Sequence, residues 1–332
     1  MSEKVLLPFH VPLFATTQGM AAPGIAIENH PTAFNGILNQ CTTISCTRRF
    51  LRGYTSPQTE VPRLGIYSFS YLNKYAVSFR FAHRHSLEII KKMLDEGFYI
   101  YFSCVDDFYL PEKSWYGIRH LAHDGIICGY DETDSTYSIA AYDMNWIFRL
   151  IRIPQKCFME GLNACVENKR FGDLTAYCMK DIDIKLEEST ILKYLKEHLD
   201  TTIDKVSLES DDRVNGIAVH DLLAMYIDKL KDGSIPSDKM DWRALRPVWE
   251  HKRCMLERLK AVETKHNWDP VFSEQYAPLV DLANRIRMMY AVYHKTQKTS
   301  LLDGIRNGLT ELSKKEYVIL TDFVGKMEEE QA

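Results

Sequence analysis

Residues 120–143 read HLAHDGIICGYDETDSTYSIAAYD, and this stretch decides the fold of the first half of the chain. The apolar run at 125–130 is short and ends in the polar segment 131–135, so it predicts a buried strand followed by a turn. The alternating pattern at 137–142 predicts the strand that returns from that turn. Together they predict an antiparallel hairpin, with a histidine before its first strand and a carboxylate after its second.

The two ends of this hairpin carry groups that can act together. If the strands pair about the turn, the chain returns so that Asp143 lies beside His123. A carboxylate bonded to one imidazole nitrogen fixes the tautomer and leaves the other nitrogen free to act as a base. Two other interpretations stay open. In the first, His123 is a hydrogen-bonded structural residue and Asp143 caps a turn. In the second, His120 and His123 bind a metal ion with Asp124 or Asp143, although no CxxC or HExxH pattern supports a metal site.

The segment before the hairpin adds a helix and strands. Apolar residues at helical spacing in 87–94, followed by Gly97, predict a helix that stops at the glycine. The apolar run 98–105 predicts a strand, and the aromatic runs 65–71 and 75–81 are also typical of strands. We therefore predict an α+β fold with an antiparallel sheet.

Two further polar features have ordinary interpretations. Asp106 and Asp107 follow the predicted strand 98–105 and fit a solvated loop better than the wall of a substrate cleft. His251 lies in a stretch with helical periodicity and fits a packing or capping residue.

Three motifs carry a resemblance to a known family. They are LDEGFYIYFSCVDDFYLP at 94–111, HDGIICGYDE at 123–132 with the later Tyr-Asp pair, and WEHKRCMLERL at 249–259. The chain resembles the papain-like fold of bacteriocin-processing cysteine peptidases. It is more similar still to the butirosin biosynthesis protein H type, which is found with non-ribosomal peptide and polyketide pathways.

The resemblance implies a chemistry and a set of site residues. It implies a cysteine nucleophile near the N-terminus, His123 as general base, Asp143 as the residue that orients it, and a glutamine as oxyanion donor. Members of the butirosin type move an acyl group from a carrier-protein thioester to an amine in antibiotic biosynthesis, whereas the related peptidases cleave after a double glycine. In both cases a thiolate attacks an acyl carbon and an amine or water releases the acyl-cysteine.

The region that should hold the nucleophile is 31–54, PTAFNGILNQCTTISCTRRFLRGY. Gln40 stands six positions before Cys46, which matches the glutamine-to-cysteine spacing of the papain-like pattern. Thr43 fits the cap of a helix whose N-terminus would lower the thiol pKa, and the arginines at 48–49 add positive potential. These features favour Cys46 as nucleophile and Gln40 as oxyanion donor.

Other interpretations of this region remain. Cys41 is an alternative nucleophile. If one helix begins near Pro31, both thiols are interior helix residues and the family's cysteine position falls at 33–35, where no cysteine stands. The protein is then a catalytically silent binding or scaffold protein, and a cysteine peptidase or amidase is a third option.

Composition limits the partners. The net charge is −4 and no polybasic run occurs, so nothing indicates nucleic acid or an anionic membrane surface. Pro8 and Pro12 break the apolar run at the N-terminus, which argues against a signal peptide or membrane span. Eight cysteines without CxxC spacing are expected to stay reduced in the cytoplasm. No motif indicates a cofactor or a metal.

The chain changes character near residue 155. We predict a papain-like catalytic domain at 1–155 and a helical substrate or partner domain at 156–332. The predicted helices of the second domain are Ile191–His198, Ala218–Leu230, Trp242–Val262, Tyr276–Tyr293 and Leu301–Lys326.

The helical domain is expected to choose the substrate or to form a homodimer through its apolar stripes. An acyl or peptidyl carrier protein is acidic, so its docking surface should be basic, and the other substrate is a small amine acceptor. The candidate basic residues are Arg48, Arg49, Arg52, Arg243, Arg246, Lys252, Arg253, Arg258 and Lys260. The alternative is that these residues form an ordinary solvated face.

Overall fold

A computed structural model describes residues 3–52, 56–79, 85–170, 172–201, 213–236 and 240–331. The protein is α+β, with antiparallel sheets and helices in the N-terminal region and mainly helices in the C-terminal region. It folds as two compact units, of which unit 1 is Met1–Phe34 with Leu64–Asp183 and unit 2 is Asn35–Arg63 with Ile184–Ala332. Among the described helices, none combines the length and apolar character that a membrane span requires.

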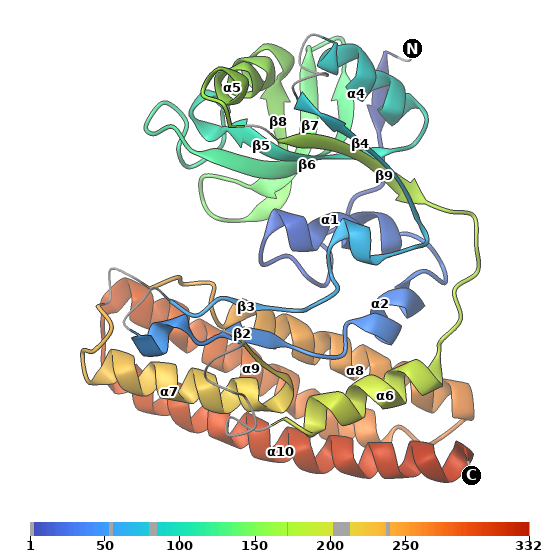
Figure 1. Cartoon of the computed structure of the whole chain (residues 1–332), viewed down its shortest axis with the longest axis vertical. Helices are drawn as coiled ribbons and strands as arrows, with labels where there is room; N and C mark the ends of the chain where they lie inside the picture. Colours follow the sequence, from blue (N-terminus) through green and yellow to red (C-terminus); the bar gives the residue numbers. More distant parts are fainter. Residues whose placement is uncertain are drawn as a thin grey trace. The chain divides into compact units, whose positions relative to one another are not determined.

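Unit 1 is built on a seven-stranded antiparallel sheet (Figure 1). Six strands follow one another in the order β4-β9-β5-β6-β7-β8, and β1 pairs with the end of β6 that β5 leaves free. The strands are β1 (Lys4–Leu6), β4 (Leu72–Ser78), β5 (Tyr99–Asp106), β6 (Ala122–Asp131), β7 (Thr136–Tyr142), β8 (Phe148–Pro154) and β9 (Asp173–Met179).

Helices cover both faces of this sheet. Helix α1 (Gln18–Ile27) lies on one face, and α4 (Ser86–Asp95) and α5 (Gln155–Glu167) lie on the other (Figure 1). Helix α1 carries few polar side chains and is buried almost all round, and Thr17 caps it by accepting a hydrogen bond from the Met20 amide at 3.3 Å. The amphipathic α4 and α5 bury one face each against the sheet.

The predicted hairpin is confirmed. Strands β6 and β7 pair antiparallel about a turn at 132–135, with Ile126 opposite Ala140 and a bulge between Ile127 and Gly129. The predicted helix and strand before it correspond to α4 and β5.

Two parts of unit 1 differ from the prediction. The run 65–71 forms no strand; its centre is the 3-10 helix η2 (Ile66–Ser68), which leaves Tyr67 66% exposed. Strand β9 was not predicted, and it follows the predicted boundary at 155. Because β9 pairs with both β4 and β5, unit 1 continues to Asp183.

Unit 2 combines a small antiparallel sheet with a helical bundle (Figure 1). Its sheet has the order β10-β2-β3, from β2 (Ser45–Thr47), β3 (Thr59–Glu60) and β10 (Arg213–Asn215). Its helices are α2 (Phe34–Gln40), α6 (Glu188–Leu199), α7 (Val219–Lys231), α8 (Arg246–His266), α9 (Val271–Thr296) and α10 (Ser300–Gln331). The last five match the five predicted helices.

The core of unit 2 explains why an N-terminal segment belongs to it. Ile44, Cys46 and Phe50 lie in one buried apolar cluster with the inner faces of α6 to α10. The segment 35–63 therefore buries its apolar side chains against the helices, although in the chain it lies between two parts of unit 1.

Candidate functional site

Polar groups of unit 1 gather where β6 begins, and His123 is central among them. Its Nδ1 lies 2.8 Å from Oδ2 of Asp107. Asp107 is the first residue of η3 (Asp107–Tyr109), the 3-10 turn that follows β5 directly. Because Val105 on β5 stands opposite His123 on β6, strand pairing brings the two side chains to one end of the sheet.

The burial of Asp107 defines the state of the imidazole. The carboxylate side chain is 2% exposed, and Nζ of the buried Lys113 lies 3.7 Å from its Oδ1. A carboxylate only accepts hydrogen bonds, so Nδ1 of His123 carries a hydrogen, and in the neutral imidazole Nε2 is then the acceptor. The ring of His123 is 33% exposed, and within the described residues its Nε2 has no hydrogen-bond partner. His123 is thus arranged as a base.

A second polar pair lies next to this dyad, on the side of α1. The Tyr101 hydroxyl donates to Oδ2 of Asp124 at 3.0 Å. A Cβ on Gly19, in the first turn of α1, would lie 3.6 Å from that carboxylate oxygen. Desolvation raises the pKa of Asp124, against the Tyr101 hydrogen bond and the nearby charge of His123. The start of β6 therefore carries a base at His123 and, at the next residue, a carboxyl whose pKa is raised.

Asp143, the predicted partner of His123, has a different role in the structure. Its Oδ1 accepts from the backbone amides of Asn145 and Ile147 at 2.8 and 2.9 Å, and its Oδ2 accepts from Nε of Arg149 at 2.6 Å. Desolvation acts to raise the pKa of Asp143, but these hydrogen bonds hold it below its usual value. The reason is local: β7 ends at Tyr142, and the chain turns at once into β8, so Asp143 caps this turn. Asp107 takes the place at His123 that we predicted for Asp143.

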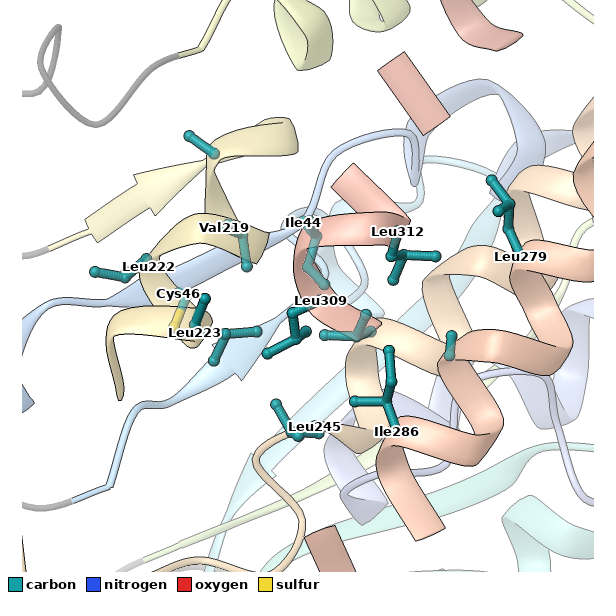
Figure 2. Packing of buried hydrophobic residues seen from close by; sticks show 14 of the residues in the cluster. Ile44, Cys46, Val219, Leu222, Leu223, Leu245, Leu279, Ile286, Leu309 and Leu312 are labelled. Carbon is teal, nitrogen blue, oxygen red and sulfur yellow. The ribbon is translucent and has the colours of Figure 1, made fainter. Parts of the chain in front are cut away.

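Cys46, the predicted nucleophile, lies in unit 2 and on strand β2 instead of in a helix capped by Thr43. Its side chain is fully buried in the apolar cluster, near Val219 and Leu223 (Figure 2). Desolvation raises its pKa to about 12, against a hydrogen bond from Thr59. Such a thiol is neither accessible nor ionised at neutral pH, which argues against a nucleophilic role.

The remaining candidates near Cys46 are also in unit 2. Cys41 follows α2 and is fully buried, and burial raises its pKa well above the usual range. Gln40 is the last residue of α2 and lines a pocket of about 280 Å³, together with Thr43, Arg63 and Glu197 among others. The structure places Gln40 and Cys46 in unit 2, and His123 in unit 1.

His120 forms a dyad of its own. Its Nδ1 lies 2.8 Å from Oδ2 of Asp106, and its ring stacks on Phe108 with the centroids 4.2 Å apart. His120 and His123 thus each bind a separate carboxylate. Among the described residues, no group of three or more histidine, cysteine or acidic side chains is arranged to hold a metal ion.

Not all of the basic residues that we considered for carrier docking lie on the surface. Lys252 and Arg258 are fully buried, and Arg258 donates to the Leu38 carbonyl at 2.7 Å. Arg246 is bound to the buried Glu250, and the guanidinium of Arg253 lies over the Trp249 ring.

The residues that sequence reasoning missed are Asp107, Tyr101 and Asp124. The acidic pair Asp106-Asp107 was the available signal, because carboxylates directly after a buried strand stand at an end of a sheet. We interpreted that pair as a solvated loop, but both carboxylates are almost fully buried.

No protein-family model matches the chain, and no curated protein matches it either.

Proposed function

We propose that this protein is an acyltransferase with a papain-like unit 1, in which His123 is the general base and Asp107 holds it in position. The donor would be an acyl or peptidyl carrier-protein thioester and the acceptor a small amine. The observation that carries the proposal is the His123–Asp107 pair, a buried carboxylate on Nδ1 with Nε2 open to solvent. The substrate classes rest on the sequence resemblance alone.

In this proposal the acyl group passes directly from donor to acceptor. The amine nitrogen attacks the thioester carbonyl carbon, and the carbon–sulfur bond breaks. Nε2 of His123 takes the proton that the amine loses and gives it to the leaving sulfur, so the imidazole ends in its starting state. Asp107 keeps the imidazole in the right tautomer and stabilises the imidazolium that forms between the two steps.

The buried thiols are the reason for omitting an acyl-cysteine. Cys46 and Cys41 are both fully buried, and the pKa of each is raised. The same observation favours the second candidate, a papain-like binding or scaffold protein without catalytic activity. A cysteine peptidase or amidase would also need one of these thiols to be exposed and ionised.

The test is amide formation by the full chain from a small acyl-N-acetylcysteamine thioester and a panel of amines, followed by mass spectrometry. We expect His123→Ala to lower the rate by about 10²- to 10⁴-fold. Asp107→Asn should lower it less, because the base remains but loses its orienting carboxylate. Cys46→Ala should keep the activity. His85→Ala is the matched control, since the exposed imidazole of this histidine of unit 1 forms an ion pair only with the exposed Glu88 among the described residues.

Circular dichroism must show that each variant is folded. An unchanged rate in His123→Ala, or a lost rate in folded Cys46→Ala, would contradict the proposal. If the unaltered protein forms no amide above background with any pair but binds a thioester or an amine, the binding protein is the correct description.

A further inference from the structure

A separate pocket of about 370 Å³ lies in unit 1, between the end of β5 and the C-terminal end of α5. Its lining residues are Asp106, His120, Ala164, Cys165, Asn168 and Arg170. Cys104 on β5 lies against the same segment, because its Sγ is 3.9 Å from the carbonyl oxygen of Arg170. Its thiol also interacts with the thiol of Cys165, so two cysteines distant in sequence meet at the pocket.

The two thiols differ in exposure and in acidity. Cys104 is partly exposed, whereas Cys165 is 2% exposed. The hydrogen bond from Cys165 lowers the pKa of Cys104 to about 7. Desolvation acts to raise this pKa, and the charge of Arg170 acts to lower it. The pKa of Cys165 is raised by its bond with Cys104 and by burial. An accessible thiolate beside a buried protonated thiol is the arrangement of an attacking and a resolving cysteine.

The other partly exposed cysteines lack these properties. Burial raises the pKa of Cys157, which lies on α5, and that of Cys178 on β9. Exposure alone therefore does not account for the acidity of Cys104. The reaction rate of Cys157 in the same protein is the reference against which the rate of Cys104 is compared.

The charge that the pocket leaves open is positive. Both oxygens of Asp106 are occupied: Oδ1 accepts from the amides of Phe108 and Leu121, and Oδ2 is bound to His120. The guanidinium of the exposed Arg170 has no ion pair within the described chain. A guanidinium without a counter-charge favours a carboxylate-bearing ligand.

We propose that Cys104 and Cys165 form a thiol–disulfide exchange site for small disulfides that carry carboxylates, with Arg170 holding the carboxylate. The site is independent of the proposed acyl transfer and uses none of its residues.

The exchange has two balanced steps. The Cys104 thiolate attacks one sulfur of the small disulfide, whose sulfur–sulfur bond breaks, and the leaving thiolate takes a proton from solvent. Cys165 then loses its proton and attacks the Cys104 sulfur of the mixed disulfide, which releases the second small thiol. The protein loses two protons and two electrons, and the small disulfide is reduced to two thiols.

The experiment compares oxidised glutathione, which bears carboxylates, with cystamine, a cationic disulfide, on the reduced full chain. Peptide mapping should find a Cys104–Cys165 disulfide after either reagent. We expect Cys104 to react about fivefold or more faster than Cys157 at pH 7, because its larger thiolate fraction outweighs the lower nucleophilicity of an acidic thiol. The rate at Cys104 should level off just above its pKa of about 7, whereas the rate at Cys157 should keep rising above pH 8.

Variants separate the roles. Cys165→Ser should stop at the mixed disulfide and retain one glutathione, and Cys104→Ser should give no adduct at this site. Arg170→Gln should slow oxidised glutathione by about three- to tenfold more than it slows cystamine, since both reagents meet less Cys104 thiolate but only glutathione loses a counter-charge. Cys157→Ser is the control and should change neither product.

Three results would overturn the proposal. They are labelling of Cys104 no faster than that of Cys157, the absence of a Cys104–Cys165 disulfide in the mapped unaltered protein, and an equal effect of Arg170→Gln on both reagents. The mapping needs no variant, so a misfolded cysteine variant does not decide the outcome. Amide formation in the unaltered protein is measured separately, so failure of this site and failure of the acyl transfer are distinguishable.

Discussion

At the scale of single residues, a group of charged and polar side chains that is costly to bury lies in the interior of unit 2. Nζ of Lys252 lies 2.6 and 2.5 Å from the two carboxylate oxygens of Glu316, and the Tyr276 hydroxyl donates to the same carboxylate at 2.5 Å. All three side chains are fully buried. Against desolvation, the charge of Lys252 holds the pKa of Glu316 well below its usual value, so the pair is ionised. It joins α8, α9 and α10 through charges that have no access to water.

Removing one member of this pair should be costly. We expect Glu316→Gln to lower the free energy of unfolding by about 3–5 kcal/mol, because Lys252 stays buried without its counter-charge. Replacing both members, as Lys252→Met with Glu316→Leu, should cost less than the single change. Urea denaturation of the two variants measures the difference. A loss below about 1 kcal/mol in Glu316→Gln would mean that Lys252 finds water or another partner, contrary to its burial.

At the scale of elements, the periodicity of the sequence predicted helices and a hairpin correctly, whereas the predicted pairing of site residues was wrong. The five helices from α6 to α10 and the β6–β7 hairpin follow from local patterns and agree with the structure. The partner of His123 does not follow from local patterns, because it depends on how the single turn η3 directs Asp107 after β5. Cys46 was misplaced for a related reason: β2 is three residues long, too short for a periodic pattern to distinguish it from a capped helix. Short elements are set by contacts distant in the sequence.

The turn between β7 and β8 gives a test of the role of Asp143. We expect Asp143→Ala to lower the free energy of unfolding of unit 1 by about 2–4 kcal/mol, because it removes hydrogen bonds from two amides and from Arg149 at a buried carboxylate. The control is Asp134→Ala, whose exposed ion pair with the exposed Arg152 should be worth less than about 1 kcal/mol. Denaturant unfolding gives both values. If Asp143→Ala were as stable as the control, Asp143 would be free for another role.

At the scale of the whole molecule, the two units should respond differently to acid. Unit 2 buries three histidines, His198, His220 and His251, and burial holds the pKa of each below the usual 6.5, to about 3 for His220. In unit 1 the hydrogen bond from His10 to Glu28 raises the pKa of His10. The stability that His10 contributes is therefore present in acid and lost as pH rises through its folded pKa. The buried histidines act in the opposite direction.

We expect unit 2 to lose stability as pH falls below about 6.5, because the unfolded chain takes up protons there that the folded unit excludes. Each buried histidine can contribute up to about 1.4 kcal/mol between pH 7.5 and 5.5, so the three together remove at most about 4 kcal/mol. Hydrogen exchange corrected for its intrinsic pH dependence should therefore show a larger loss of protection in α8 and α10 than in β6 and β7. His251→Gln keeps a donor for the Thr42 carbonyl, which accepts from Nε2 of His251 at 2.8 Å, and should reduce the loss. Equal losses in both units, or a slope unchanged by His251→Gln, would mean that these histidines gain protons without unfolding, and that water reaches the interior of the bundle in acid.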